Sequence, residues 1–258
     1  MTKAVWFLFL ISQCCPMCAQ ADPFIKTIDT VKMSVLPVAC STVPDSKQGL
    51  AVKQIKGTGF FVNFDGDFIT AAHVITDNFK WDKKGEPDPD CFPVIYVPNP
   101  TWQSARWFQF GRCTVDNKID IAVCKVGLNP FSLPELHLAR LHLRSRVPED
   151  GTAVAFTGFP QFITVPITSR ANVASSGEFI TPGQTDIVID KTTWHGVSGG
   201  PLYLADGSVV GIVIRMGDYV LSGMGFVRQT SSFLKFLSEK KITIWQEEEK
   251  PSTKKKKK

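Results

Sequence analysis

Short apolar runs, rich in β-branched and aromatic residues, recur along the chain between turns that contain Gly, Pro and Asp. In the first half of the chain, the runs cover residues 31–40, 60–64, 68–70, 94–97, 106–110, 112–115 and 119–126. In the second half, they cover residues 152–157, 162–167, 172–180, 185–190, 202–204, 208–214 and 219–227. Runs of this length and spacing are typical of antiparallel strands, and helices do not alternate with them as a parallel sheet would require.

The turns and the connector divide these strands into two groups. Asp-Gly pairs at residues 65–66 and 206–207 stand between apolar runs, which is a strong signal for a β-hairpin. A connector with several prolines, residues 127–150, separates two groups of about six strands each. We therefore predict an all-β fold with two antiparallel barrels or sandwiches, the first over about residues 31–128 and the second over about residues 150–228.

Two segments depart from the strand pattern. Within residues 231–240, apolar side chains recur at helical spacing, which predicts a C-terminal helix that packs on the body. Residues 74–93 begin with a short helical stretch and continue, over residues 81–93, as a loop that is long for a compact domain. We interpret this loop either as a functional surface loop or as a surface insertion without a function of its own.

Charge is concentrated at the ends of the chain. The 258 residues carry 29 basic and 24 acidic side chains, a formal charge of +5. Lys3 and Lys254–Lys258 supply six of the basic groups, which leaves 23 against all 24 acidic groups in residues 22–253, a net charge of −1. The folded body is therefore not expected to bind polyanions. The charged residues 246–258 are expected to be disordered, and their lysines could make weak contacts with anionic lipid or nucleic acid.

The first 21 residues have the pattern of a secretory signal peptide. Lys3 precedes the apolar run of residues 4–11, and Ala19 and Ala21 match a small-residue cleavage site. The run is too short to span a bilayer as a helix, although an uncleaved N-terminal anchor is the alternative. We predict cleavage near Ala21 and export, to the periplasm or outside the cell, of a mature domain over residues 22–240.

Four cysteines remain after cleavage: Cys40, Cys91, Cys113 and Cys124. An even number in an exported protein permits disulfides, and three pairings are possible. Four buried free thiols are the alternative, because some of these cysteines lie in apolar runs. Their spacing suits no zinc site, and we expect neither a metal nor another cofactor.

The most distinctive stretch is residues 194–201, which read Trp-His-Gly-Val-Ser-Gly-Gly-Pro. Gly196 and Gly199 can adopt dihedral angles closed to other residues, so that the amides of Gly196 and Ser198 can point at one spot beside the Ser198 hydroxyl. That spot would be an oxyanion hole. By itself, the stretch could equally be a Gly-rich turn between two strands.

A serine nucleophile needs a general base. His73 follows a strand and two small alanines, which leave room for its ring. His137 and His142 fall in the connector, where an exposed surface position is the better interpretation, and His195 is too close in sequence to Ser198. We therefore assign His73 as the candidate base.

The base in turn needs an acid to orient it. Asp120 opens the apolar run of residues 121–123, where a carboxylate is costly unless something pairs with it. Asp116 is the second choice, because its neighbours resemble an exposed turn. The order His73, Asp120, Ser198 places the base and acid in the first half and the nucleophile in the second, and predicts a site between them.

These motifs resemble the trypsin-like serine peptidases of the chymotrypsin fold, and most of all the protease domain of the Deg/HtrA family. The matching stretches are residues 57–61, 70–74, 120–123, 158–160, 190–202 and 223–226, within a likeness that spans about residues 31–238. The resemblance implies two six-stranded β-barrels and a serine endopeptidase that works through an acyl-enzyme intermediate. It implies that His73 is the general base, that Asp120 orients it, and that Ser198 attacks. It also implies an oxyanion hole of the Gly196 and Ser198 amides, with help from Val197.

The resemblance is incomplete before the nucleophile. Trp194 and His195 stand where family members usually carry Asn and Pro, and such bulky residues could narrow the cleft. A catalytically weak or inactive peptide-binding protein with a peptidase fold is therefore the alternative function. No PDZ domain follows in the sequence, so the family's peptide tethering and its route to oligomers are not carried over.

By the same resemblance, Thr192, Ile214, Arg215 and Met216 line the pocket for the residue before the scissile bond. Because no acid stands at Thr192, a demand for Lys or Arg is not expected. Ile214 and Met216 favour a small or aliphatic residue. Arg215 could instead pair with a carboxylate of the substrate.

Overall fold

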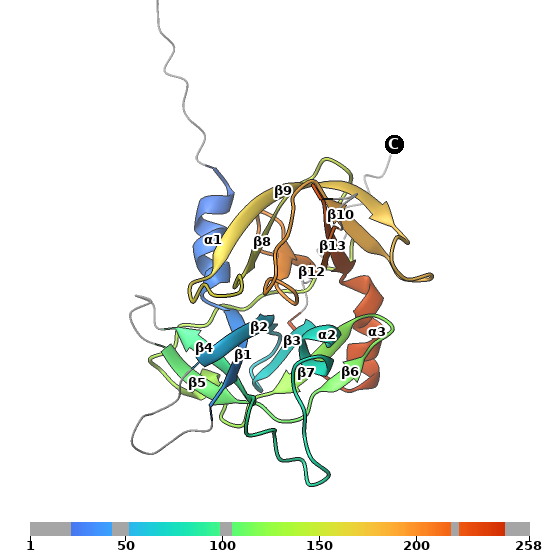
Figure 1. Cartoon of the computed structure of the whole chain (residues 1–258). Helices are drawn as coiled ribbons and strands as arrows, with labels where there is room; N and C mark the ends of the chain where they lie inside the picture. The colour runs from blue at the N-terminus through green and yellow to red at the C-terminus, as the bar shows by residue number, and fades with distance from the viewer. Residues whose placement is uncertain (1–21, 43–51, 99–104, 218–221, 246–258) are drawn as a thin grey trace, which may run out of the picture.

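The computed structural model describes residues 22–42, 52–98, 105–217 and 222–245. The predicted signal peptide, residues 1–21, and the Lys-rich tail, residues 246–258, lie outside the described residues. Two β-structured halves stack on each other, and the connector runs along them (Figure 1). None of the helices in the described part is long and apolar enough to cross a membrane.

The second half is a closed antiparallel barrel, as predicted. Its strands follow the order β10-β13-β12-β11-β8-β9 around the barrel. The bounds are β8 (Ala153–Gly158), β9 (Ile167–Gly177), β10 (Asp186–Ile189), β11 (Pro201–Tyr203), β12 (Val209–Met216) and β13 (Gly225–Gln229). The barrel interior is filled by aliphatic and aromatic side chains, which form a core of its own.

The first half is a seven-stranded sheet over the described residues, so one of the two predicted barrels is confirmed and the other is not. The order is β5-β4-β1-β2-β3-β7-β6. The bounds are β1 (Val35–Ser41), β2 (Val52–Phe61), β3 (Asp67–Ala71), β4 (Phe92–Pro98), β5 (Ala105–Gln109), β6 (Thr114–Asp116) and β7 (Ile121–Lys125). The short β6 pairs with the outer edge of β7, which leaves only an isolated bridge between Phe110 and Val126 to join the end of β5 to the end of β7.

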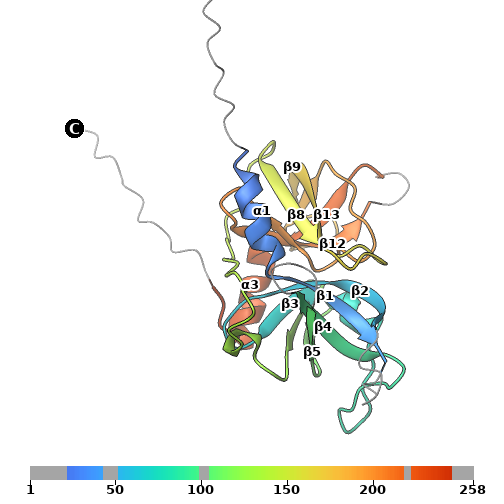
Figure 2. The same ribbon diagram turned by 90° about the vertical axis from the view of Figure 1, so that its left-hand side faces the viewer.

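In the described residues, three α-helices and a short 3-10 helix, η1 (Pro130–Ser132), accompany the strands. The predicted C-terminal helix is α3 (Ser231–Glu239), and the short helix after β3 is α2 (Ala72–Thr76). α1 (Phe24–Lys32) was not predicted, and it occupies the start of the apolar run assigned to a strand over residues 31–40. Phe24 and Val31, seven residues apart, are both buried, because that spacing places them on one face of a helix, and the helix packs beside β8 (Figure 2).

Other boundaries also differ from the pattern. Residues 162–167 were predicted as a strand but form a loop up to the start of β9, and Phe162 there is 83% exposed. β13 begins at Gly225 rather than near residue 219, and β2 extends back to Val52, ahead of the apolar run predicted over residues 60–64. Pairing with β1 extends β2, as in the register of Ala39 opposite Ile55.

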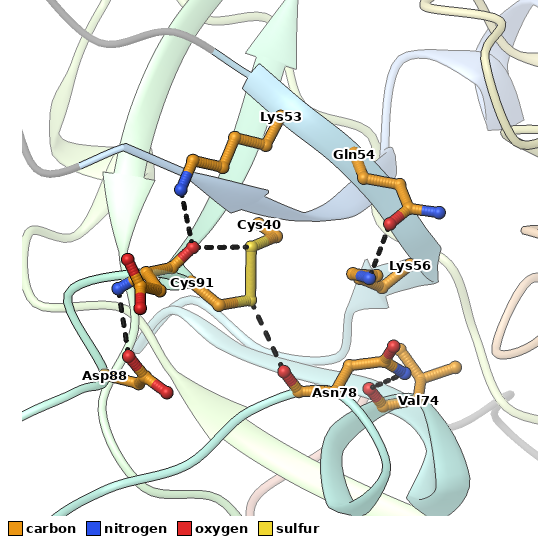
Figure 3. Close-up of a disulfide and its surroundings, with 9 residues drawn as sticks. Cys40, Lys53, Gln54, Lys56, Val74, Asn78, Asp88 and Cys91 are labelled. Carbon is orange, nitrogen blue, oxygen red and sulfur yellow. Dashed lines mark hydrogen bonds between the residues drawn. A yellow bond between two sulfur atoms is a disulfide. The ribbon is translucent and has the colours of Figure 1, made fainter.

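Two disulfides resolve the open question of the cysteines. Cys40 pairs with Cys91, and Cys113 pairs with Cys124. The first ties the long loop after α2 to β1, and the Lys53 ammonium group donates to the carbonyl of Asp90 beside it (2.8 Å; Figure 3). Both disulfides lie in the first half of the molecule.

Candidate active site

His73 lies in the first turn of α2, directly after β3, and Asp120 from the start of β7 meets it there. The backbone amide of Ala72 donates to the Asp120 carbonyl (3.1 Å), and the amide of His73 donates to the Asp120 carboxylate (3.0 Å). Asp120 therefore accepts hydrogen bonds from two backbone amides at the start of this helix. Its own backbone has a positive φ of 55°. A non-Gly residue rarely adopts that conformation without a stabilising contact.

The side chains of the two residues also meet. His73 Nδ1 lies 2.9 Å from one carboxylate oxygen of Asp120 and 3.1 Å from the other. Asp116, the second choice, instead accepts the amide of Lys118 in a turn (2.9 Å). A hydrogen bond from Nδ1 to the carboxylate selects the tautomer in which Nε2 carries no proton, which is the form a general base requires.

The pKa of His73 is raised above its ordinary value of 6.5. Burial acts to lower the pKa, but the hydrogen bond and the negative charge of Asp120 oppose it, with a further contribution from the charge of Asp77, and together they prevail. The imidazole is still accessible, with 38% of the side chain exposed. The pair therefore holds a basic imidazole at the molecular surface.

The turn around Ser198 depends on its glycines. Gly196 and Gly199 have φ values of 93° and 87°. A Cβ on Gly199 would lie 2.1 Å from the carbonyl oxygen of Thr58 and 2.8 Å from the amide of Ala71. A Cβ on Gly196 would lie 2.4 Å from the carbonyl oxygen of Phe159. Only glycine fits at both positions.

These close contacts place the serine turn against the strands that lead to His73. Thr58 in β2 donates its amide to the Ser198 carbonyl (2.8 Å) and its hydroxyl to the Gly196 carbonyl (2.7 Å). Gly199, the residue after the serine, touches Ala71, which lies two residues before His73. The turn that carries Ser198 therefore packs against β2 and the end of β3, at the junction between the two halves.

The carbonyl groups around the serine are also held in place. The His195 carbonyl accepts the amide of Gln161 (2.8 Å), and the Val197 carbonyl accepts the amide of Gly200 (2.8 Å). In a trans peptide the N–H and the carbonyl point in opposite directions. The amide of Gly196 therefore points away from Gln161, and the amide of Ser198 points away from the amide of Gly200.

Among the described residues, no acceptor is bonded to the amide of Gly196 or of Ser198. The amide of Val197 differs, because it donates to the carbonyl of Trp194 (3.3 Å). It is therefore occupied within the turn, and the predicted help from Val197 finds no support in this geometry.

The two bulky residues before the serine have different surroundings. The Trp194 ring packs on Phe156 in the barrel core, with ring centroids 5.4 Å apart. His195 is exposed, and its backbone carbonyl is bonded to the loop that follows β8. The expectation that Trp194 would narrow the cleft is not supported by this packing.

Two of the predicted pocket residues lie beside the candidate base. Ile214 and Arg215 line a hollow, open to solvent, together with His73 and Asp120. Thr192 is not among the lining residues of that hollow, and its hydroxyl donates to the carbonyl of Ser222. The side chain of Met216 lies outside the described part of the chain.

Six further lining residues of this hollow were not predicted from the sequence: Thr76, Asn117, Lys118, Ile180, Thr181 and Arg228. Arg228 had a detectable signal, because it is the one charged residue in the strand of residues 225–229. A second, mostly apolar hollow shares Ile180 and Arg215 with the first and extends over Phe179 and Met224.

The chain is similar to known proteases. A family model described as the trypsin-like peptidase domain matches residues 57–212. "Putative protease Do-like 14" of Arabidopsis thaliana is 30% identical over 72% of this chain and 41% of its own length. "Serine protease HTRA4" of Homo sapiens is 30% identical over 71% of this chain and 34% of its own length. A "Probable periplasmic serine endoprotease DegP-like" of Chlamydia pneumoniae is also 30% identical, over 71% of this chain and 33% of its own length.

Solved structures share the fold. The "HtrA-type protease AlgW with tripeptide" superposes with a TM-score of 0.62 and 17% identity, over 85% of this chain and 63% of that chain. The active form of the Rv3671c protease from M. tuberculosis superposes with a TM-score of 0.59 and 22% identity, over 85% of each chain. The chain spans well under half the length of the curated relatives it matches.

Proposed function

Because the chain belongs to the trypsin-like peptidase domain family, with Deg/HtrA proteases among its relatives, we propose that it is a serine endopeptidase. The observation that carries the proposal is the His73–Asp120 pair, with Nδ1 bonded to the carboxylate at 2.9 Å, beside a serine turn that only glycines permit. The His73–Asp120 pair alone, or the glycine-dependent turn alone, is compatible with a purely structural role. Acyl transfer by a serine requires both.

In the proposed mechanism, His73 Nε2 takes the proton of the Ser198 hydroxyl as the oxygen attacks the carbonyl carbon of the substrate. Asp120 holds the ring in the required tautomer and stabilises the imidazolium that forms. The amides of Gly196 and Ser198 stabilise the negative charge of the tetrahedral intermediate. His73 then gives its proton to the leaving amine, and water hydrolyses the acyl ester on Ser198 by the same steps.

We also propose a preference for a small or aliphatic residue before the scissile bond. The proposal is supported by the absence of an acid at Thr192, which leaves no counter-charge for a basic residue. Peptide or protein substrates would lie along the exposed part of β12 at Arg215.

Export of the mature chain is part of the proposal. Two disulfides support an oxidising compartment, as does the relative whose name places it in the periplasm. The tail of residues 254–258 could add weak contacts with anionic surfaces.

A fluorophosphonate probe on the purified protein tests the proposed activity, because such probes label activated serines. We expect covalent labelling on Ser198, lost in Ser198→Ala and in His73→Ala. Ser238→Ala, in α3, removes an equivalent hydroxyl outside the site and should leave the labelling unchanged. A folded wild-type protein that stays unlabelled, and that retains an intact peptide, would instead support the peptide-binding alternative.

A further inference from the structure

The hollow beside His73 is unusual in its charge. Three of its lining residues are cationic: Lys118, Arg215 and Arg228. Asp120 is the one acidic residue among those that line it, and its carboxylate already accepts the His73 ring and the His73 amide. The hollow therefore offers more positive charge than its own acid can balance.

Arg228 forms the buried part of this lining. Its side chain is 1% exposed, and it lies on β13 opposite Asp186 on β10, whose side chain is also fully buried. Arg228 Nη1 lies 3.3 Å from an Asp186 carboxylate oxygen, and Nη2 donates to the hydroxyl of Thr181 (3.2 Å). The carboxylate of Asp186, on the neighbouring strand β10, thus balances the positive charge of Arg228.

The hydrogen-bond capacity of Arg228 is not used up by these contacts. Among the described residues, no acceptor is aligned with Nε or Nη1 in hydrogen-bond geometry. A buried guanidinium with unused donors is costly, and such groups in folded proteins usually find a partner in solvent or in a ligand. Arg228 lines the hollow, with its Nε and Nη1 atoms buried within that lining.

Lys118 and Arg215 stand at the rim of the hollow. Both side chains belong to exposed residues, and neither has an acidic partner within the part of the chain that the structure describes. Arg215 lies on β12 and Lys118 in the turn before β7, so the two cations approach the hollow from the two halves of the molecule.

The position of the hollow relates it to one residue of a bound substrate. In an extended peptide, successive side chains point to opposite sides. If the residue before the scissile bond enters the pocket at Thr192, the side chain of the preceding residue points away from Thr192. The hollow fits that residue, because it is lined by His73 and not by Thr192.

We propose that this hollow is an acid-selective subsite that binds the carboxylate of an Asp or Glu located two residues before the scissile bond. The inference rests on the proposed endopeptidase function and adds a substrate class to it. Lys118 and Arg215 contact the carboxylate, and the buried Arg228, paired with Asp186, completes the cationic lining.

Two quenched fluorescent peptides test this subsite. Both carry Ala before the scissile bond, and they differ only in the preceding residue, which is Glu in one and Gln in the other. We expect kcat/KM to be about tenfold higher for the Glu peptide, mainly through KM, because a charge-assisted hydrogen bond replaces a neutral one. The advantage should shrink at high salt, and it should disappear when Glu is moved one residue further from the bond.

Variants at the exposed rim avoid the buried pair, whose disruption could unfold the barrel. In Lys118→Gln/Arg215→Gln, the ratio of kcat/KM between the two peptides should fall to about one. Lys235→Gln removes an equivalent charge on α3 and should keep the ratio. Equal cleavage of the two peptides by the wild-type protein would overturn the subsite while leaving the endopeptidase function intact.

If neither peptide is cleaved, the proposed function fails, and binding then decides the subsite. Fluorescence anisotropy with Ser198→Ala compares the affinities of the uncleaved Glu and Gln peptides. Tighter binding of the Glu peptide, lost in the double rim variant, supports the subsite. Equal affinities contradict it.

Discussion

The two halves of the molecule hold their site residues by different means. The first-half sheet, which presents His73 and Asp120, ends in two edge strands, β5 and β6, and it contains both disulfides. The second-half barrel, which presents the Ser198 turn, is closed, and no disulfide lies in its described residues. A closed barrel pairs every strand on both sides, whereas an open sheet lacks that support at its edges.

Both disulfides cross-link strands of the open sheet. Cys113–Cys124 joins β7 to the residue before the edge strand β6, whereas Cys40–Cys91 joins the interior strand β1 to the residue before β4, which is also interior. We infer that the half carrying the acid–base pair depends on covalent cross-links. The half carrying the nucleophile depends on close backbone packing, in which a single added methyl group cannot be accommodated.

The largest expected effect follows from removing the longer cross-link. Cys40→Ala/Cys91→Ala opens a loop with a sequence separation of 51 residues, and the separation for Cys113–Cys124 is 11. Loop-closure entropy predicts a loss in the free energy of unfolding of about 4 kcal/mol for the first pair and about 3 kcal/mol for the second. Denaturant titration measures both losses.

Hydrogen exchange locates the loss in the first of these variants. In Cys40→Ala/Cys91→Ala, amides of β4 and β5 should exchange faster, while those of β12 and β13 should keep their protection. Wild-type protein treated with a reducing agent should behave in the same way. Faster exchange of equal size in both halves would contradict the contrast between them.

The next effect concerns the serine turn. In Gly199→Ala, the new methyl group meets the Thr58 carbonyl and the Ala71 amide, and the positive φ adds strain. We expect a loss of about 2–3 kcal/mol in unfolding free energy, from overpacking together with backbone strain, and a loss of probe labelling at Ser198.

Gly183→Ala separates the two contributions. Gly183 has a similar φ of 76°, but a methyl group there would meet nothing within 4 Å. This variant should lose only about 1 kcal/mol from strain and should keep its labelling. Equal effects of the two substitutions would show that strain alone matters, and that packing against the first half does not hold the serine turn.

Much of this architecture is readable from local pattern. Both Asp-Gly hairpins, the C-terminal helix and the types of residue needed for acyl transfer follow from short stretches of sequence, because turns and amphipathic faces depend on near neighbours. His73, Asp120 and Ser198 were singled out by such signals, and the structure brings the first two into contact.

Features that depend on residues far apart in the sequence could not be predicted from local pattern. Whether the first-half sheet closes depends on β6 occupying the edge of β7, which no local pattern encodes. The apolar residues 162–165 were read as a strand, yet they belong to a loop whose start packs against Gly196. The pairing of Arg228 with Asp186 depends on the register of two strands about 40 residues apart in sequence, and register is set by the whole sheet.

The smallest expected effect is a shift in the pH profile, and it concerns the first half alone. A general base must be neutral, so kcat/KM should rise with pH through the pKa of His73, which is raised above 6.5. Asp77→Asn removes a negative charge that contributes to this rise, so the midpoint should move to lower pH by less than about one unit. Asp29→Asn, on α1, makes the same charge change at a distance and should not move it.

The same group affects stability in the opposite direction. Because the pKa of His73 is higher in the folded protein than in the unfolded chain, protonated His73 stabilises the fold. That contribution is complete below about pH 6.5, the unfolded value, and is lost as the pH rises through the folded pKa, while activity increases. Unfolding titrations between pH 5.5 and 8.5 should therefore show a smaller decline for Asp77→Asn than for the wild type. A midpoint of kcat/KM below 6.5 in the wild type would mean that burial, rather than Asp120, dominates the environment of the imidazole.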